Sequence, residues 1–166
     1  MAVNDVFTSG QILTSTEMNN LPFGLLGAST ATAGTSFTAG TALQVLTLTV
    51  TIVPNRRYRI GGQAAVQPTS AASTIQILYV TATGLTSQTL TYDGHSLPQN
   101  FNYLMHGETY VTAADFGVTT GTGTSKTLSL YVQVNGANGS LTTNPDSIVG
   151  ANSAAQKLWV EDIGSA

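Results

Sequence analysis

Apolar and polar residues alternate along much of the chain from residue 44 onward. In the segment 46–52, leucine, valine and isoleucine take every second position, and threonine fills the positions between them. A period of two is the period of a β-strand, whose successive side chains point to opposite faces. This segment therefore predicts a strand with one apolar and one hydroxyl face, and similar patterns predict strands at 58–66, 75–80, 128–134 and 158–163.

Turn residues separate these segments. Pro54-Asn55 predicts a turn, Asp93-Gly94 has the composition of a hairpin turn, and Asn135-Gly136 follows the end of an alternating run. The segment 75–80 is apolar on both faces, which is typical of a central strand. About eight strands and almost no helix are expected, which excludes a parallel α/β sheet. We therefore predict an all-β fold, an antiparallel two-sheet sandwich that is jelly-roll-like.

The first 27 residues have a different pattern. They are apolar without a clear period, and Thr14 and Glu17 have the spacing of a capping box, whereas Pro22 stops a helix. At most a short helix is expected between residues 15 and 20. We therefore divide the chain into an extended N-terminal docking arm, residues 1–27, and a single β-sandwich domain, residues 28–166.

The composition excludes several classes of function. Only 8% of the 166 residues are charged, the formal net charge is −3, and there is no cysteine. Disulfides, zinc–thiolate centres and cysteine nucleophiles are therefore excluded, and the charge balance predicts neither a nucleic-acid nor a membrane partner. No apolar run approaches the length needed to span a bilayer. Low surface charge is expected of a chain that neighbouring subunits cover in an assembly.

Two pairs of residues could ligate a metal. Asp93 and His95, and likewise His106 and Glu108, are spaced to share one face of a strand, and all four could converge if the two segments paired. The alternative is two exposed histidines near loops, with Asp93 in a turn. A metal bound there would make a further function possible, that of a metal-dependent, cupin-like enzyme that uses His95 and His106. No nucleophile elbow or catalytic triad is present, so we predict no enzyme activity, no catalytic residue and no cofactor.

Arginines and aromatic residues are the remaining candidates. Arg56, Arg57 and Arg59 are expected to form ion pairs, either within the chain or with a neighbouring subunit. Aromatic residues gather around the irregular stretch 101–116 and could stack on sugars, although packing in the core or between subunits is the commoner fate. They are Tyr92, Phe101, Tyr103, Tyr110 and Phe116.

Three segments resemble a known family when taken together. The first segment, 7–24, contains Phe-Thr-Ser-Gly-Gln-Ile-Leu-Thr at 7–14 and Glu-Met-Asn-Asn-Leu-Pro-Phe-Gly at 17–24. The second is Arg-Arg-Tyr-Arg-Ile at 56–60, and the third is Leu-Trp-Val-Glu-Asp-Ile-Gly at 158–164. This pattern resembles small β-rich virion proteins and minor-tail-protein-like domains of tailed bacteriophages, especially those of actinobacteria. It covers about a quarter of the chain. Family members often have tryptophan in place of Phe23 and proline in place of Ser165.

The resemblance implies a non-enzymatic structural protein on the outer surface of the virion. A single domain with an arm suits a head-decoration (minor capsid) protein, expected as a homotrimer in contact with the major capsid protein or other virion proteins. Its arm would attach through apolar residues, aided by Arg56, Arg57 and Arg59. The expected apolar interface residues are Leu13, Met18, Leu21, Phe23, Leu25 and Leu26. The alternative is a tail-fibre or tail-tip receptor-binding domain that recognises host surface glycans through the aromatic stretch.

Overall fold

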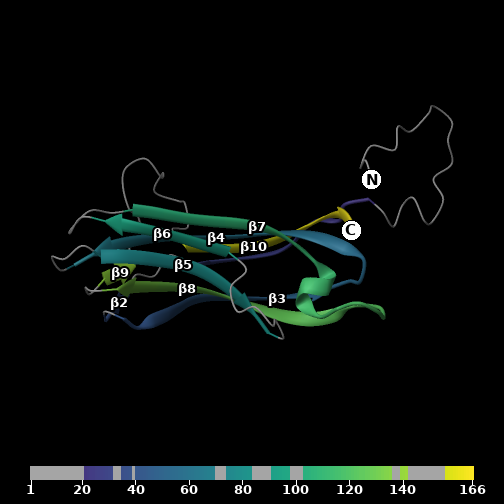
Figure 1. Ribbon diagram of the computed structural model, residues 1–166, viewed down its shortest axis with the longest axis horizontal. Helices are drawn as coiled ribbons and strands as arrows, with labels where there is room; N and C mark the ends of the chain where they lie inside the picture. Colours follow the sequence, from purple (N-terminus) through teal and green to yellow (C-terminus); the bar gives the residue numbers. More distant parts are fainter. Residues whose placement is uncertain are drawn as a thin grey trace, which may run out of the picture.

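The computed structural model describes residues 21–31, 35–38, 40–69, 74–83, 91–97, 103–135, 139–141 and 156–166. These residues form ten β-strands and one short 3-10 helix (Figure 1). No helix in this part of the chain is long and apolar enough to cross a membrane. The elements are β1 (Gly24–Ala31), β2 (Ser36–Phe37), β3 (Ala42–Ile52), β4 (Arg56–Pro68), β5 (Thr74–Ala82), β6 (Thr91–Leu97), β7 (Tyr103–Thr112), η1 (Ala113–Phe116), β8 (Thr124–Asn135), β9 (Gly139–Leu141) and β10 (Gln156–Ser165).

The strands form two antiparallel sheets. One has four strands in the order β3-β8-β5-β6, and the other has six, in the order β1-β10-β4-β9-β2 with β7 also paired to β4. Strand β9 pairs with the last three residues of β4, beyond those that pair with β10. In Figure 1, β7, β4 and β10 lie in the upper part of the molecule, and β8 and β3 lie in the lower part.

The pairing of the longer strands is nested. Strand β1 pairs with β10, β3 with β8, β4 with β7, and β5 with β6. Each pair encloses the next, so the chain is one long antiparallel ribbon that doubles back between β5 and β6. Rolling such a ribbon places alternate pairs in opposite sheets, which is the jelly-roll arrangement. The predicted all-β jelly-roll-like sandwich is therefore confirmed.

The core lies between the two sheets and follows the predicted alternation. Tyr58, Ile60, Ala64 and Val66 of β4 are fully buried, as the pattern at 58–66 predicts. Gly62, at the same face, allows the opposite sheet to approach, because a Cβ there would lie 2.6 Å from Cδ1 of Leu130. The other large contributors come from both sheets and η1, and include Ile52, Leu78, Val80, Met105, Phe116, Leu128, Leu158 and Val160.

One predicted turn is wrong. Asp93-Gly94 lies inside β6, where Asp93 pairs with Leu78 and Gly94 with Ile77. The turn preference is a property of these two residues alone, whereas the strand register aligns them with β5, the preceding strand of the chain, and the pairing between strands prevails. In contrast, Pro54-Asn55 does form a turn, with Asn55 in the left-handed region at φ 60°. Strand β5 is central, between β8 and β6, as its two apolar faces predict.

The N-terminal segment joins the sheet earlier than its composition indicates. Strand β1 begins at Gly24, so residues 24–27, which we assigned to the arm, form the first half of an edge strand paired to β10. The short helix expected between residues 15 and 20 lies outside the described residues.

Candidate functional site

The point where the arm joins the sandwich is held by a buried ion pair. Nε and Nη2 of Arg56 donate to the carboxylate of Asp162 at 2.8 and 2.5 Å, and both side chains are almost inaccessible, at 5% and 1% exposure. Nη2 of Arg56 also donates to the carbonyl oxygen of Leu21 at 2.6 Å, and its guanidinium lies 4.2 Å from the ring centroid of Phe23. We call Leu21, Phe23, Arg56 and Asp162 the arm root.

Apolar side chains are exposed at the arm root. Phe23 is 57% exposed and Leu25, at the start of β1, is 61% exposed, while Leu21 is just above a third. Leu26 instead packs against the core. Of the six predicted apolar interface residues, Leu21, Phe23 and Leu25 are therefore available to a partner, and Leu13 and Met18 lie outside the described residues.

A second cluster lies on the outer face of the six-stranded sheet. Nε and Nη2 of Arg59 donate to the two carboxylate oxygens of Glu108 at 2.7 and 2.8 Å, and Nη1 donates to Glu161 at 3.2 Å. The strand register explains both contacts. Arg59 of β4 is paired with Glu161 of β10 on one side and with Tyr110 of β7 on the other, and Glu108 lies two residues before Tyr110, on the same face of β7. Tyr110 is 65% exposed on this face.

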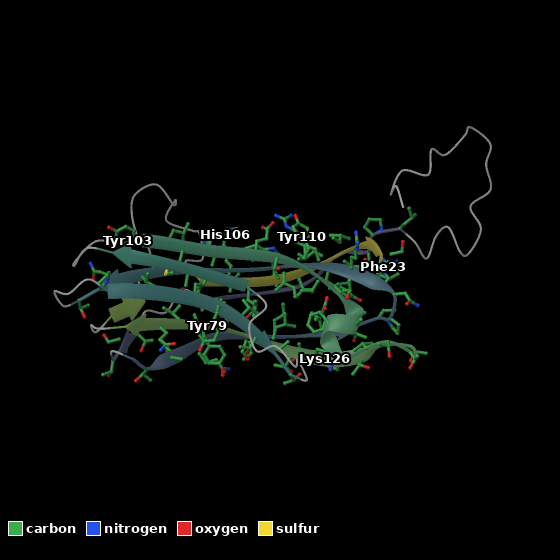
Figure 2. All side chains as sticks on the ribbon, in the orientation of Figure 1. Phe23, Tyr79, Tyr103, His106, Tyr110 and Lys126 are labelled. Carbon is green, nitrogen blue, oxygen red and sulfur yellow. The ribbon has the colours of Figure 1, made fainter. Side chains whose placement is uncertain are left out.

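Trp159 crosses this face over a glycine. It is paired with Gly61, and its six-membered ring occupies the space above that residue: a Cβ on Gly61 would lie 1.9 Å from Cζ2. The ring thereby reaches over β4 to β7, where His106 stacks against it with centroids 5.6 Å apart and planes at 21°. We call the outward side chains Arg59, His106, Glu108, Tyr110, Trp159 and Glu161, with Gly61 beneath the indole, the Trp159 face. In Figure 2, His106, Tyr110 and Phe23 lie along the upper side of the molecule, and Tyr79 and Lys126 lie in the lower half.

The predicted arginine pairs form within this chain. Arg56 and Arg59 both bind carboxylates of their own subunit, whereas Arg57 is exposed on β4. The sequence leaves intramolecular and intersubunit pairing open, and in the structure two of the three arginines pair within the chain.

Acidification is expected to weaken the Arg59–Glu108 contribution to stability. The hydrogen bond from Arg59 lowers the pKa of Glu108 below its ordinary value of 4.5. A lowered folded-state pKa stabilises the fold above the unfolded-state pKa, and this contribution is lost as the pH falls through the folded-state value. Urea unfolding at about pH 7 and about pH 3 should therefore show a stability gap between the wild type and Glu108→Gln that shrinks at the lower pH. A gap of equal size at both values would contradict this prediction.

The two halves of the predicted metal site lie in different sheets. Asp93 and His95 belong to β6, which pairs with β5, whereas His106 and Glu108 belong to β7, which pairs with β4. The structure describes the backbone but not the side chains of Asp93 and His95. Nε2 of His106 lies 3.8 Å from Glu108. Among the described residues, no group of three or more His, Cys, Asp or Glu side chains is arranged to hold a metal ion.

The predicted aromatic cluster is divided between the core and the surface. Phe116 is fully buried and packs edge-on against Tyr58 with centroids 6.2 Å apart, and Tyr103 packs against the core. Tyr110 points outward instead. Phe101 and the side chain of Tyr92 lie outside the described part of the chain.

Sequence reasoning missed two features of these sites. Asp162 follows Leu158 and Val160 at the inward spacing of its strand, and a charged residue there indicates a buried partner. Gly61 stands in a strand interior, which often marks close approach by another group. Neither signal identifies its partner, because the partner is set by strand register.

No family model matches this sequence, and no curated protein matches it. Among solved structures, the chain is similar to that of the Gx strain of infectious bursal disease virus, with TM-score 0.45 and 13% identity over 98% of this chain and 42% of the other. It is also similar to the VP2 subviral particle of that virus, with TM-score 0.44 and 15% identity over 87% and 37%. A third structure, of the T13 viral particle, gives TM-score 0.46 and 12% identity over 89% and 37%. The chain thus spans about two fifths of the length of these proteins. The jelly-roll assignment rests on the strand pairing of the chain itself.

Proposed function

We propose that this protein is a non-enzymatic structural component of a bacteriophage virion, a head-decoration protein on the outer surface that is attached through its N-terminal arm. The observation that carries the proposal is the arm root. The three segments that resemble phage virion proteins are distant in the sequence, yet they meet there: Arg56 opens β4, Asp162 lies in β10, and Leu21 precedes β1. The segments that carry the resemblance therefore contact one another at the arm root, where the arm joins the sandwich.

The exposed apolar side chains at the arm root support attachment through this part of the molecule. The body has its own closed core between the sheets, so its folding does not require a partner to cover that core. Phe23 and Leu25, in contrast, expose large apolar side chains beside the point where the arm begins. Exposed apolar groups of this size are typical of surfaces that a partner covers. The proposed partners are the major capsid protein and other copies of this chain, as a homotrimer.

Immunogold labelling of intact virions with an antibody to this protein tests the location. Label spread over the head is the expected result. Label confined to the tail end would replace decoration by a tail role, and the absence of label from intact virions would contradict a virion surface protein altogether.

Removal of residues 1–20 is expected to abolish attachment while leaving the sandwich folded, because β1 begins at Gly24 and the deletion leaves the arm root in place. Co-sedimentation with particles that lack the protein measures attachment, and thermal unfolding measures the fold. As a matched control, Thr49→Ala changes an exposed hydroxyl on the opposite sheet and should leave co-sedimentation unchanged. If the truncated protein still co-sediments with particles, the arm is not the attachment element.

A further inference from the structure

We propose that the Trp159 face is a binding site for neutral carbohydrate. The inference goes beyond decoration and does not depend on a position on the head, since a head or a tail protein could present this face. It also differs from the glycan site expected from the sequence: Phe116, one of the aromatic residues of that site, is fully buried.

The first argument is the aromatic surface. Sugar rings present C–H groups that pack against aromatic faces, so a carbohydrate site needs aromatic side chains held at the surface of the protein. Trp159 meets this need because it is partly exposed, Gly61 lets its ring lie across β4, and His106 stacks against the indole. Tyr110, 65% exposed, supplies a second aromatic group on the same face. A glycine inside a central strand lacks side-chain packing of its own, and here its place is filled by the indole ring.

The second argument is the supply of hydrogen-bonding groups. Arg59 donates one hydrogen bond to each oxygen of Glu108, and each carboxylate oxygen can accept two. Both Glu108 and Glu161 are partly exposed, so these acceptors lie within reach of the hydroxyl groups of a ligand. The fixed guanidinium keeps the carboxylates oriented, and bidentate pairing of this kind is geometrically specific.

The third argument selects a neutral ligand. Arg59 binds two carboxylates, so the cluster of Arg59, Glu108 and Glu161 has a formal charge of −1. The two other basic side chains on this side of β4 and β10, Arg57 and Lys157, lie at the next outward-facing positions beyond the two ends of the Trp159 face. An acidic sugar seated over this cluster would meet two ionised carboxylates, and it could pair with Arg59 only by displacing one of them. A neutral sugar requires no such displacement, and it can use the carboxylates as acceptors for its hydroxyl groups.

The intrinsic fluorescence of the protein tests the proposal directly, because Trp159 is the single tryptophan among the 166 residues. The full-length chain is first screened on an array of neutral and acidic oligosaccharides. The strongest neutral binder, together with glucose, galactose and mannose at millimolar concentrations, is then titrated in solution while the emission of Trp159 is recorded. A saturable change with at least one neutral sugar is expected.

Two variants locate the site. Tyr110→Ala should weaken the neutral sugar by about tenfold, and Trp159→Ala should abolish binding on the array. Because Tyr110 is exposed, its variant is expected to fold, and thermal unfolding checks this. Tyr131→Ala is the matched control: Tyr131 stacks on Tyr79 at 5.2 Å on the opposite sheet, and its replacement should leave sugar affinity unchanged.

Three results would overturn the proposal. They are no emission change with any neutral sugar, binding of acidic sugars alone, and neutral binding that Tyr110→Ala and Trp159→Ala leave intact. A saturable emission change with purified capsid protein and none with sugars would assign the face to protein docking instead. The labelling pattern on virions is a separate measurement, so failure of the sugar site and failure of the decoration role are distinguishable.

Discussion

Replacing Asp162 by alanine is expected to lower the free energy of unfolding by about 3–5 kcal/mol. The substitution leaves the guanidinium of Arg56 buried without the carboxylate that it contacts through two nitrogens. It also removes the acceptor of the Gly164 backbone N–H, which lies 2.9 Å from Oδ1 of Asp162 beside an irregularity in β10. An uncompensated buried charge is among the costliest single changes in a folded protein. Urea denaturation at neutral pH measures the loss.

The adjacent acidic residue provides the control for this experiment. Glu161 pairs with Arg59 at the surface, and Glu161→Ala should cost no more than about 1 kcal/mol. The double variant Arg56→Met with Asp162→Leu should recover much of the loss, because both buried charges are then absent. If Asp162→Ala is no less stable than Glu161→Ala, the arm root is not held by this ion pair.

Replacing Phe116 by alanine is expected to cost about 3–5 kcal/mol of unfolding free energy. Phe116 is fully buried at the end of η1, and its ring packs edge-on against Tyr58. Tyr58 in turn both accepts a hydrogen bond from the backbone of Val53, at 2.7 Å, and donates one to it, at 3.0 Å. Loss of the Phe116 ring therefore leaves a cavity beside a side chain that fixes the turn between β3 and β4. Thermal and urea unfolding together report the change.

Tyr110→Ala is the matched comparison, because it removes an aromatic ring from the same β7–η1 region at an exposed position. Its cost should stay within about 0.5 kcal/mol. Equal destabilisation by the two substitutions would contradict the division of these aromatic residues into core and surface.

The alternating pattern predicts the fold class and the inward faces, but not the strand order. Segments such as 46–52 and 58–66 carry their own period of two, so they are recognisable without their neighbours. The pairing of β1 with β10 leaves no local trace, because it joins the two ends of the domain. Asp93-Gly94 shows the opposite failure, because the turn preference of the two residues is overridden by the pairing of β6 with the preceding strand, β5.

The sequence predicts the type of interaction at each site but not the residues that take part in it. The arginines at 56 and 59 were expected to form ion pairs, and they do, but Asp162, Glu108 and Glu161 became their partners only through register. The aromatic cluster was expected from proximity in sequence. In an antiparallel sheet, however, adjacent residues point to opposite faces. The ring that meets His106 of β7 comes from Trp159 of β10, which lies on the other side of β4 in the sheet and outside the stretch 101–116.

The nested order of the strands also constrains how the chain can acquire its structure. The pair β5–β6 is local and can form first, while β4–β7, β3–β8 and β1–β10 enclose progressively longer stretches of chain. Loop-closure entropy makes the outer pairs slow to form, and folds dominated by such contacts take milliseconds to seconds. Strand β10 also lies between β1 and β4, so the six-stranded sheet cannot be completed on the ribosome until residues 156–165 have emerged. The arm root needs Asp162, so it forms only after β10 has been synthesised, and assembly through the arm is then confined to chains in which the whole sandwich has emerged.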